Sequence, residues 1–162
     1  RMSQFTSANL KQLTRQKVLH TIPKMKPNIV IDTNVLLTAL KSSRGASYRL
    51  LSLLDEKQYV VHVSTPLVAE YEAVLKRGHL ALSEQQIEDI IDFICAKAVH
   101  HEIFYLWRPV LKDADDDFLL ELAVKAQAMI VTWNLIDFKR AETFGIRVMN
   151  PRDFLNFLEN PA

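Results

Sequence analysis

The chain has 162 residues, which is the length of one domain and enough to bury a substantial core. Its apolar share of 49% and charged share of 24% are ordinary for a soluble globular protein, and the sequence contains neither an apolar run of membrane-spanning length nor a signal-peptide pattern. A single cysteine, Cys95, excludes an internal disulfide, so we expect a reducing, cytoplasmic location.

The formal net charge of +1 is unevenly distributed along the chain. Residues 1–27 contain no acidic residue but several basic ones: Arg1, Lys11, Arg15, Lys17, Lys24 and Lys26. Apolar residues at loosely helical spacing predict a short helix in this basic N-terminal extension, which Pro23 and Pro27 separate from the rest. The extension is either a nucleic-acid arm or a solvated helix face, and we favour the second. Residues 28–160 then form the main domain.

Four apolar runs predict strands. They cover residues 28–32, 59–64, 128–132 and 145–149, and the first three are rich in β-branched residues. His62 falls inside the second strand, where we expect a satisfied core or edge histidine rather than a metal ligand. A run without polar alternation is typical of a strand that is buried on both faces, as in a parallel sheet.

Helical patterns separate these strands. Six helices are predicted. The first follows Asn34, the second covers 46–56, and the third begins at Thr65–Pro66 and ends near Arg77. The fourth runs from the capping box at Ser83 to Ala98, the fifth starts in the acidic run 113–117, and the sixth follows Asn150–Pro151. We expect His100–His101 to be loop and 103–106 a short extended piece. The alternation predicts βαβ units, and therefore an α/β protein with a parallel sheet and helices on both faces.

Polar side chains collect where the predicted strands end. The first strand is followed by Asp32 and Asn34, the second by Ser64, Thr65 and Glu70, and the third by Thr132, Asn134 and Asp137. The acidic run 113–117 heads the helix that leads into the third strand, so its first turn lies on the same edge. The carboxyl edge of an open α/β sheet is where ligands bind. Each acid also has a structural interpretation, as a turn residue, a helix cap or a solvated side chain.

Crowded carboxylates repel one another, and a bound cation would neutralise them. Because no histidine or cysteine cluster accompanies them, the predicted ligands are all oxygen atoms, which favours Mg²⁺ or Mn²⁺ over zinc. Magnesium retains bound water and prefers phosphate oxygens. The pattern therefore favours phosphodiester hydrolysis by a metal-activated water.

Four short motifs resemble those of the PIN domain family. They are Ile-Asp-Thr-Asn-Val at 31–35, Glu-Tyr at 70–71, Asp-Asp-Asp-Phe-Leu-Leu-Glu-Leu-Ala at 115–123 and Val-Thr-Trp-Asn-Leu-Ile-Asp-Phe at 131–138. Each is weak alone, but together they follow the family's order and spacing from Asn28 to Leu158. Within the family, the sequence is most similar to bacterial VapC-like toxins of toxin–antitoxin pairs.

The resemblance implies a Rossmann-like three-layer α/β/α sandwich that acts as a metal-dependent ribonuclease on RNA. It also implies a homodimer or higher oligomer and, for a toxin, an inhibitory antitoxin partner. By position it assigns the catalytic and metal-binding acids to Asp32, Glu70, Asp116 and Asp137. The supporting residues are Thr33, Asn34, Asp117, Thr132 and Asn134.

Three features depart from the family pattern. Ala114 stands where related sequences often have proline, and the basic segment before Asn28 is not part of the usual pattern. Asn134 replaces an aspartate found in many relatives, which leaves Asp137 as the charged fourth member. The duty of Asp137 is therefore open.

Two other functions remain alternatives to an endoribonuclease. The first is a catalytically silent PIN fold that serves as a binding module in an RNA-processing or toxin–antitoxin complex; the intact acids argue against it. The second is a phosphohydrolase of the haloacid dehalogenase type, since Asp32 follows a strand. That chemistry requires an aspartate two residues later, where this chain has Asn34.

Overall fold

The computed structural model describes residues 25–103 and 114–161, with the side chains of the last segment described from Asp117 on. The predicted N-terminal helix and most of the predicted extended piece at 103–106 lie outside the described residues. The elements in chain order are β1 (Asn28–Ile31), α2 (Thr33–Lys41), α3 (Ala46–Ser52), β2 (Val60–Ser64), α4 (Thr65–Lys76), α5 (Glu84–Lys97), β3 (Val99–His101), α6 (Ala114–Ala126), β4 (Met129–Val131), the 3-10 helix η1 (Leu135–Phe144), β5 (Val148–Met149) and α7 (Pro151–Glu159).

The strands form one parallel sheet in the order β3-β2-β1-β4-β5. β1 lies at its centre, with Ile29 opposite Val61 of β2 on one side and Val30 opposite Ile130 of β4 on the other. The central strands are short and apolar on both faces, as helix-covered parallel strands must be. The predicted α/β class with a parallel sheet is confirmed.

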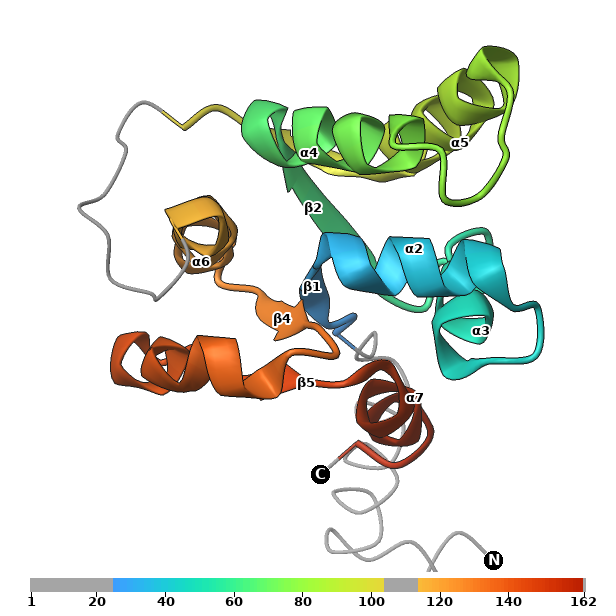
Figure 1. Cartoon of the computed structure of the whole chain (residues 1–162). Helices are drawn as coiled ribbons and strands as arrows, with labels where there is room; N and C mark the ends of the chain where they lie inside the picture. The colour runs from blue at the N-terminus through green and yellow to red at the C-terminus, as the bar shows by residue number, and fades with distance from the viewer. Residues whose placement is uncertain (1–24, 104–113, 162) are drawn as a thin grey trace, which may run out of the picture.

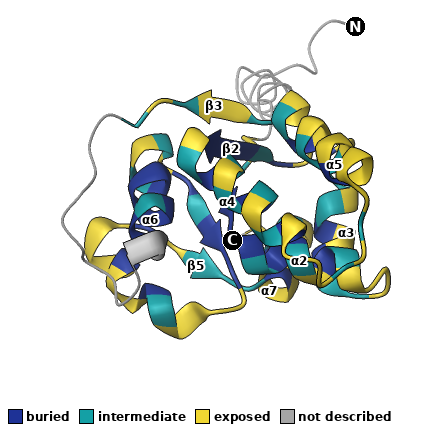
Figure 2. Cartoon of the chain, turned by 45° about the horizontal axis from the view of Figure 1, so that its top comes forward, coloured by how far each residue is buried: buried dark blue, intermediate teal, exposed yellow. Residues whose placement is uncertain are grey.

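Helices cover both faces of this sheet and give it two separate cores. Val30 and Ile130 pack with residues of α4, α5, α6 and η1, whereas Ile29, Ile31 and Val131 pack with residues of α3 and α7. Figure 1 shows α6 and α3 on opposite sides of β1 and β4. In Figure 2 strand β2 is buried, whereas the outward sides of the helices, such as α5, are exposed. The protein is therefore a three-layer α/β/α sandwich.

The structure corrects three predicted local features. α3 ends at Ser52 rather than near Glu56, because the next residues form successive turns with N–H groups bonded to the carbonyl three residues earlier, and Lys57 then takes a positive φ of 52°. The N-cap of α4 is Ser64, whose hydroxyl accepts a hydrogen bond from the Leu67 N–H, and not Thr65. Residues 99–101 form edge strand β3 instead of a loop, because their backbone pairs with β2 from His62 to Ser64.

Two predicted helix starts are confirmed, whereas α2 begins at Thr33, with Asp32 as its N-cap, rather than after Asn34. The capping box at the start of α5 is complete, with Ser83 and Gln86 exchanging hydrogen bonds, and Asn150 caps α7 through its side chain. Among the helices that the structure describes, each is too short or too polar to cross a membrane.

Candidate active site

Asp32 stands directly after β1, at the carboxyl edge of the sheet. Its backbone N–H donates to the Val131 carbonyl at 3.0 Å and so continues the β1–β4 ladder by one residue. Its side chain caps α2, because Oδ1 accepts a hydrogen bond from the Thr33 N–H at 2.7 Å. The carboxylate is thus fixed by both the strand and the helix that it connects.

The second carboxylate oxygen of Asp32 joins a network with the loop after β4. Oδ2 accepts hydrogen bonds from the Thr132 hydroxyl at 2.7 Å and from Asn34 Nδ2 at 3.1 Å. Thr132 Oγ1 in turn accepts from Asn34 Nδ2 and from the Asn134 N–H. A carboxylate can accept about four hydrogen bonds, so three donors orient Asp32 and still leave capacity for a ligand.

Burial makes the charge on Asp32 costly. The residue is only 8% exposed, and burial raises the pKa of its carboxyl above the ordinary 3.8. The hydrogen bonds from Thr132 and Thr33 lower the pKa in part, whereas the charge of Asp137 raises it further. A cation next to Asp32 would remove this cost, because an opposite charge favours the ionised form.

Glu70 approaches the same edge from α4. The Thr33 hydroxyl donates a hydrogen bond to Glu70 Oε2 at 2.8 Å, and the Thr33 N–H donates to Asp32, so Thr33 links the two acids although they are far apart in sequence. The next residue, Tyr71, is buried and donates its hydroxyl hydrogen bond to the Ile31 carbonyl of β1. This bond fixes the rotation of α4 about its axis. Glu72 therefore turns away and pairs with Lys76 at 2.6 Å.

Asp137 and Asp117 are the other predicted acids whose side chains the structure describes. Asp137 lies in the first turn of η1, half-buried and within electrostatic range of Asp32. Asp117 is buried near the start of α6, while the side chain of Asp116 lies outside the described residues. In the described part of the chain, no three histidine, cysteine, aspartate or glutamate side chains are grouped closely enough to hold one ion.

The residues that do meet suit a hard cation. Mg²⁺ is commonly bound through one or two carboxylates, with water and substrate phosphates completing its shell. Asp32 and Glu70 provide two carboxylates, and their neighbours Thr33, Asn34 and Thr132 carry hydroxyl and amide groups rather than nitrogen or sulfur ligands. The donor set and the unfavourable burial of the Asp32 charge therefore both fit Mg²⁺ or Mn²⁺.

Three features of the structure were not foreseen from the sequence. Trp133 donates its indole N–H to the Ser47 hydroxyl at 2.8 Å, and nothing in the sequence singles out Ser47. Glu121 is a buried acid, at 7% exposure, one helical turn after Asp117. Its spacing from Asp117 within an otherwise apolar stretch was the signal that could have predicted its place on the same helix face. The apolar spacing around Tyr71 predicts burial, but not the bond of its hydroxyl to β1.

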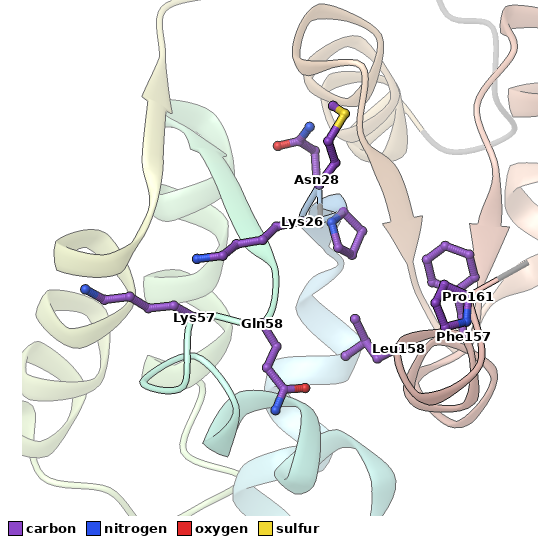
Figure 3. A pocket seen from close by; sticks show the side chains of 9 residues that line it. Lys26, Asn28, Lys57, Gln58, Phe157, Leu158 and Pro161 are labelled. Atoms are coloured by element: carbon purple, nitrogen blue, oxygen red, sulfur yellow. The ribbon is translucent and has the colours of Figure 1, made fainter. Parts of the chain in front are cut away.

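A hollow lies away from these acids, at the amino end of the sheet. It has a volume of about 480 Å³, and Figure 3 shows Lys26, Asn28, Lys57 and Phe157 among the side chains around it. Because Asn28 begins β1 and Asp32 follows its end, the length of the strand separates this hollow from the candidate active site.

Comparison with known proteins identifies the domain family. A profile of the PIN domain matches residues 28–135. The uncharacterized protein MJ1680 of Methanocaldococcus jannaschii is 24% identical over 157 residues, which cover 87% of this chain and 97% of that protein.

A solved structure shares the fold. VapBC2 from Rickettsia felis, in a crystal structure with a DNA fragment from its promoter, superposes with a TM-score of 0.54 and 17% identity, covering 76% of this chain and 98% of the other. The profile covers more than half of the chain, and its range contains Asp32, Glu70 and Thr132. The chain therefore belongs to the PIN domain family.

Proposed function

We propose that the protein is a metal-dependent endoribonuclease that hydrolyses RNA phosphodiester bonds with a metal-activated water, and that it is the toxin of a toxin–antitoxin pair. The observation that carries the proposal is the buried Asp32 carboxylate, which Thr132 and Asn34 orient and which Thr33 links to Glu70. Two oriented carboxylates at the carboxyl edge of a parallel sheet are suited to divalent-cation binding.

In this proposal Asp32 and Glu70 would hold Mg²⁺ or Mn²⁺, with Asp116 as a further ligand. The bound ion would lower the pKa of its water and neutralise the developing charge on the phosphate. Thr132 and Asn34 keep the Asp32 carboxylate in position. Asp137, whose charge acts on Asp32, would orient the metal or the attacking water through a bound solvent molecule. Asp117, Thr33 and Asn134 support these groups.

The toxin assignment and its partners follow from family membership and fold similarity. The solved structure that shares this fold is a VapBC2 complex bound to promoter DNA. For the present chain we propose a cognate antitoxin, an RNA substrate and a homodimer or higher oligomer, acting in the cytoplasm. A small antitoxin-like reading frame beside the gene would support the cellular role.

The test is cleavage of single-stranded RNA by the purified protein with Mg²⁺ or Mn²⁺. We expect cleavage to stop with a chelator, to return on addition of the metal, and to be lost in Asp32→Asn. Asp153→Asn is the matched control, because Asp153 is an exposed aspartate in the first turn of α7. Cleavage that survives exhaustive chelation would contradict the proposal.

One observation favours a second candidate, a PIN-fold binding module without activity. The described residues lack a cluster of three metal-binding acids, and a silent module would need none. This candidate predicts RNA or protein binding that Asp32→Asn leaves unchanged, with no cleavage under any metal condition.

A further inference from the structure

A hollow of about 600 Å³ between α3 and α7 is lined by three arginines. They come from three different parts of the chain: Arg44 precedes α3, Arg49 lies within α3, and Arg152 is in the first turn of α7. The other lining residues are small, polar or apolar, and none is acidic. Separate elements therefore bring positive charge together on one concave surface.

Two of these guanidinium groups are available to a ligand. Arg49 pairs with Glu159 at 2.9 Å, but both side chains are more than half exposed, so this ion pair is weak. Within the described residues, Arg44 and Arg152 have no carboxylate partner. A guanidinium group presents a planar fork of donors that matches a phosphate in geometry and charge.

Trp133 connects this hollow with the candidate active site. Its backbone N–H donates to Asn34 Oδ1 at 3.2 Å, and Asn34 binds Asp32. Its indole N–H donates to Ser47, which lies between two residues of the hollow's lining, Ala46 and Tyr48. With 37% of its surface exposed, the indole still offers area to a ligand.

We propose that the three arginines bind backbone phosphates of a single-stranded RNA whose scissile bond lies at Asp32, and that a base between them stacks on Trp133. An aromatic ring beside a positively charged groove is the combination that binds single strands with little sequence preference. An acidic peptide would use the arginines but has no use for the indole. The inference rests on the proposed function, to which it adds the path of the substrate.

The test measures binding of a short single-stranded oligoribonucleotide to the full chain, by fluorescence anisotropy in the presence of chelator so that no cleavage occurs. The variant is Arg44→Gln/Arg152→Gln. The control is Arg77→Gln, an exposed arginine at the end of α4 and outside the hollow. Each lost phosphate contact should lower the slope of log K against log salt by about 0.7. We therefore expect a slope smaller by about 1.4 and at least tenfold weaker binding for the double variant, with no change in the control.

Trp133→Leu provides an independent measurement, since it should weaken binding about tenfold without changing the salt slope. With metal present, the arginine variant should raise KM and leave kcat nearly unchanged. An unchanged RNA affinity and salt slope in the arginine variant would overturn the inference. So would a result in which this variant binds a poly-aspartate peptide more weakly but binds the RNA as before. RNA binding through the arginines in a protein that never cleaves would overturn only the proposed nuclease function.

Discussion

Two buried polar groups of this protein differ in how their charge is handled. At the carboxyl end of β1, the pKa of the Asp32 carboxyl is raised by burial and by the charge of Asp137. Between β2 and β3, His62 Nδ1 lies 2.7 Å from His101 Nε2, and His62 Nε2 lies 2.8 Å from Asn28 Oδ1. Burial lowers the pKa of both histidines, so the pair is neutral near pH 7.

The difference separates a structural polar group from a candidate functional one. The histidine pair satisfies its own hydrogen bonds and gives the short, polar strand β3 its connection to β2. The hydrogen bonds to Asp32 orient its charge but do not neutralise it, and the charge of Asp137 repels it. Strain of this kind is common at binding and catalytic sites. The comparison can be tested by changing each group in turn.

The largest effect is expected for Glu70→Gln. The substitution keeps the shape and removes a ligand charge, so RNA cleavage should fall about 100-fold or more and metal affinity should weaken. Glu72→Gln is the matched control: its partner is Lys76 on the exposed side of α4, and its stability should change by no more than about 0.5 kcal/mol. Cleavage rate and metal affinity should be measured for both. An inactive Glu72→Gln beside an active Glu70→Gln would contradict this site.

The sequence predicted the face of α4 only through the family pattern. Helix geometry places positions 70 and 72 about 200° apart but does not say which faces the site. The physical reason is the Tyr71 hydroxyl bound to the Ile31 carbonyl, a contact between residues far apart in sequence. In contrast, the central strands and the shared edge of Asp32 and Thr132 followed from apolar runs that end in polar residues.

Elements that depend on pairing rather than composition were missed. Val99–His101 contains two histidines and has no strand signal of its own, and it is a strand because β2 offers its edge. In the same way, Ser64 and Thr65 are both good helix caps by composition. Only the geometry of the Ser64 hydroxyl and the Leu67 N–H identifies the residue that caps α4.

A smaller effect on metal affinity is expected from Thr132→Val. The substitution keeps the volume of this fully buried side chain but removes the 2.7 Å hydrogen bond to Asp32. Losing a group that orients a metal ligand typically costs 10- to 100-fold in metal affinity or activity, so we expect that range. Titration with Mn²⁺ measures it. Thr38→Val on the exposed face of α2 is the control, and equal affinities in the two variants would show that Thr132 has no orienting role.

The histidine pair predicts a loss of stability in acid. A histidine pKa lowered below 6.5 in the folded protein means that the unfolded chain binds protons more readily, so the free energy of unfolding falls as pH drops below about 6.5. His101→Gln should make this decline in melting temperature shallower. His79→Gln, at an exposed position, should leave it unchanged. A decline that is identical in the two variants would assign it to other groups.

The smallest effect tests whether Asp137 is part of the site or a helix-start residue. Asp137 and Asp153 both lie in the first turn of a helix, where a negative charge interacts favourably with the helix dipole. If that were the only role of Asp137, Asp137→Asn and Asp153→Asn would each lower the melting temperature slightly. Asp137, however, also raises the pKa of buried Asp32.

A raised aspartate pKa means that ionisation costs stability as pH rises above 3.8 and through the higher value of the folded protein. Removing the charge of Asp137 should therefore stabilise the metal-free protein at pH 7, by no more than about 0.5 kcal/mol, and this gain should vanish in acid where Asp32 is protonated. Added Mg²⁺ should cancel the gain as well, because an ion at Asp32 already offsets the repulsion. Melting temperatures of both variants across pH, with and without Mg²⁺, measure this. A fall in Asp137→Asn that matches Asp153→Asn at every pH would make Asp137 an ordinary helix-start residue and leave Asp32 and Glu70 to act without it.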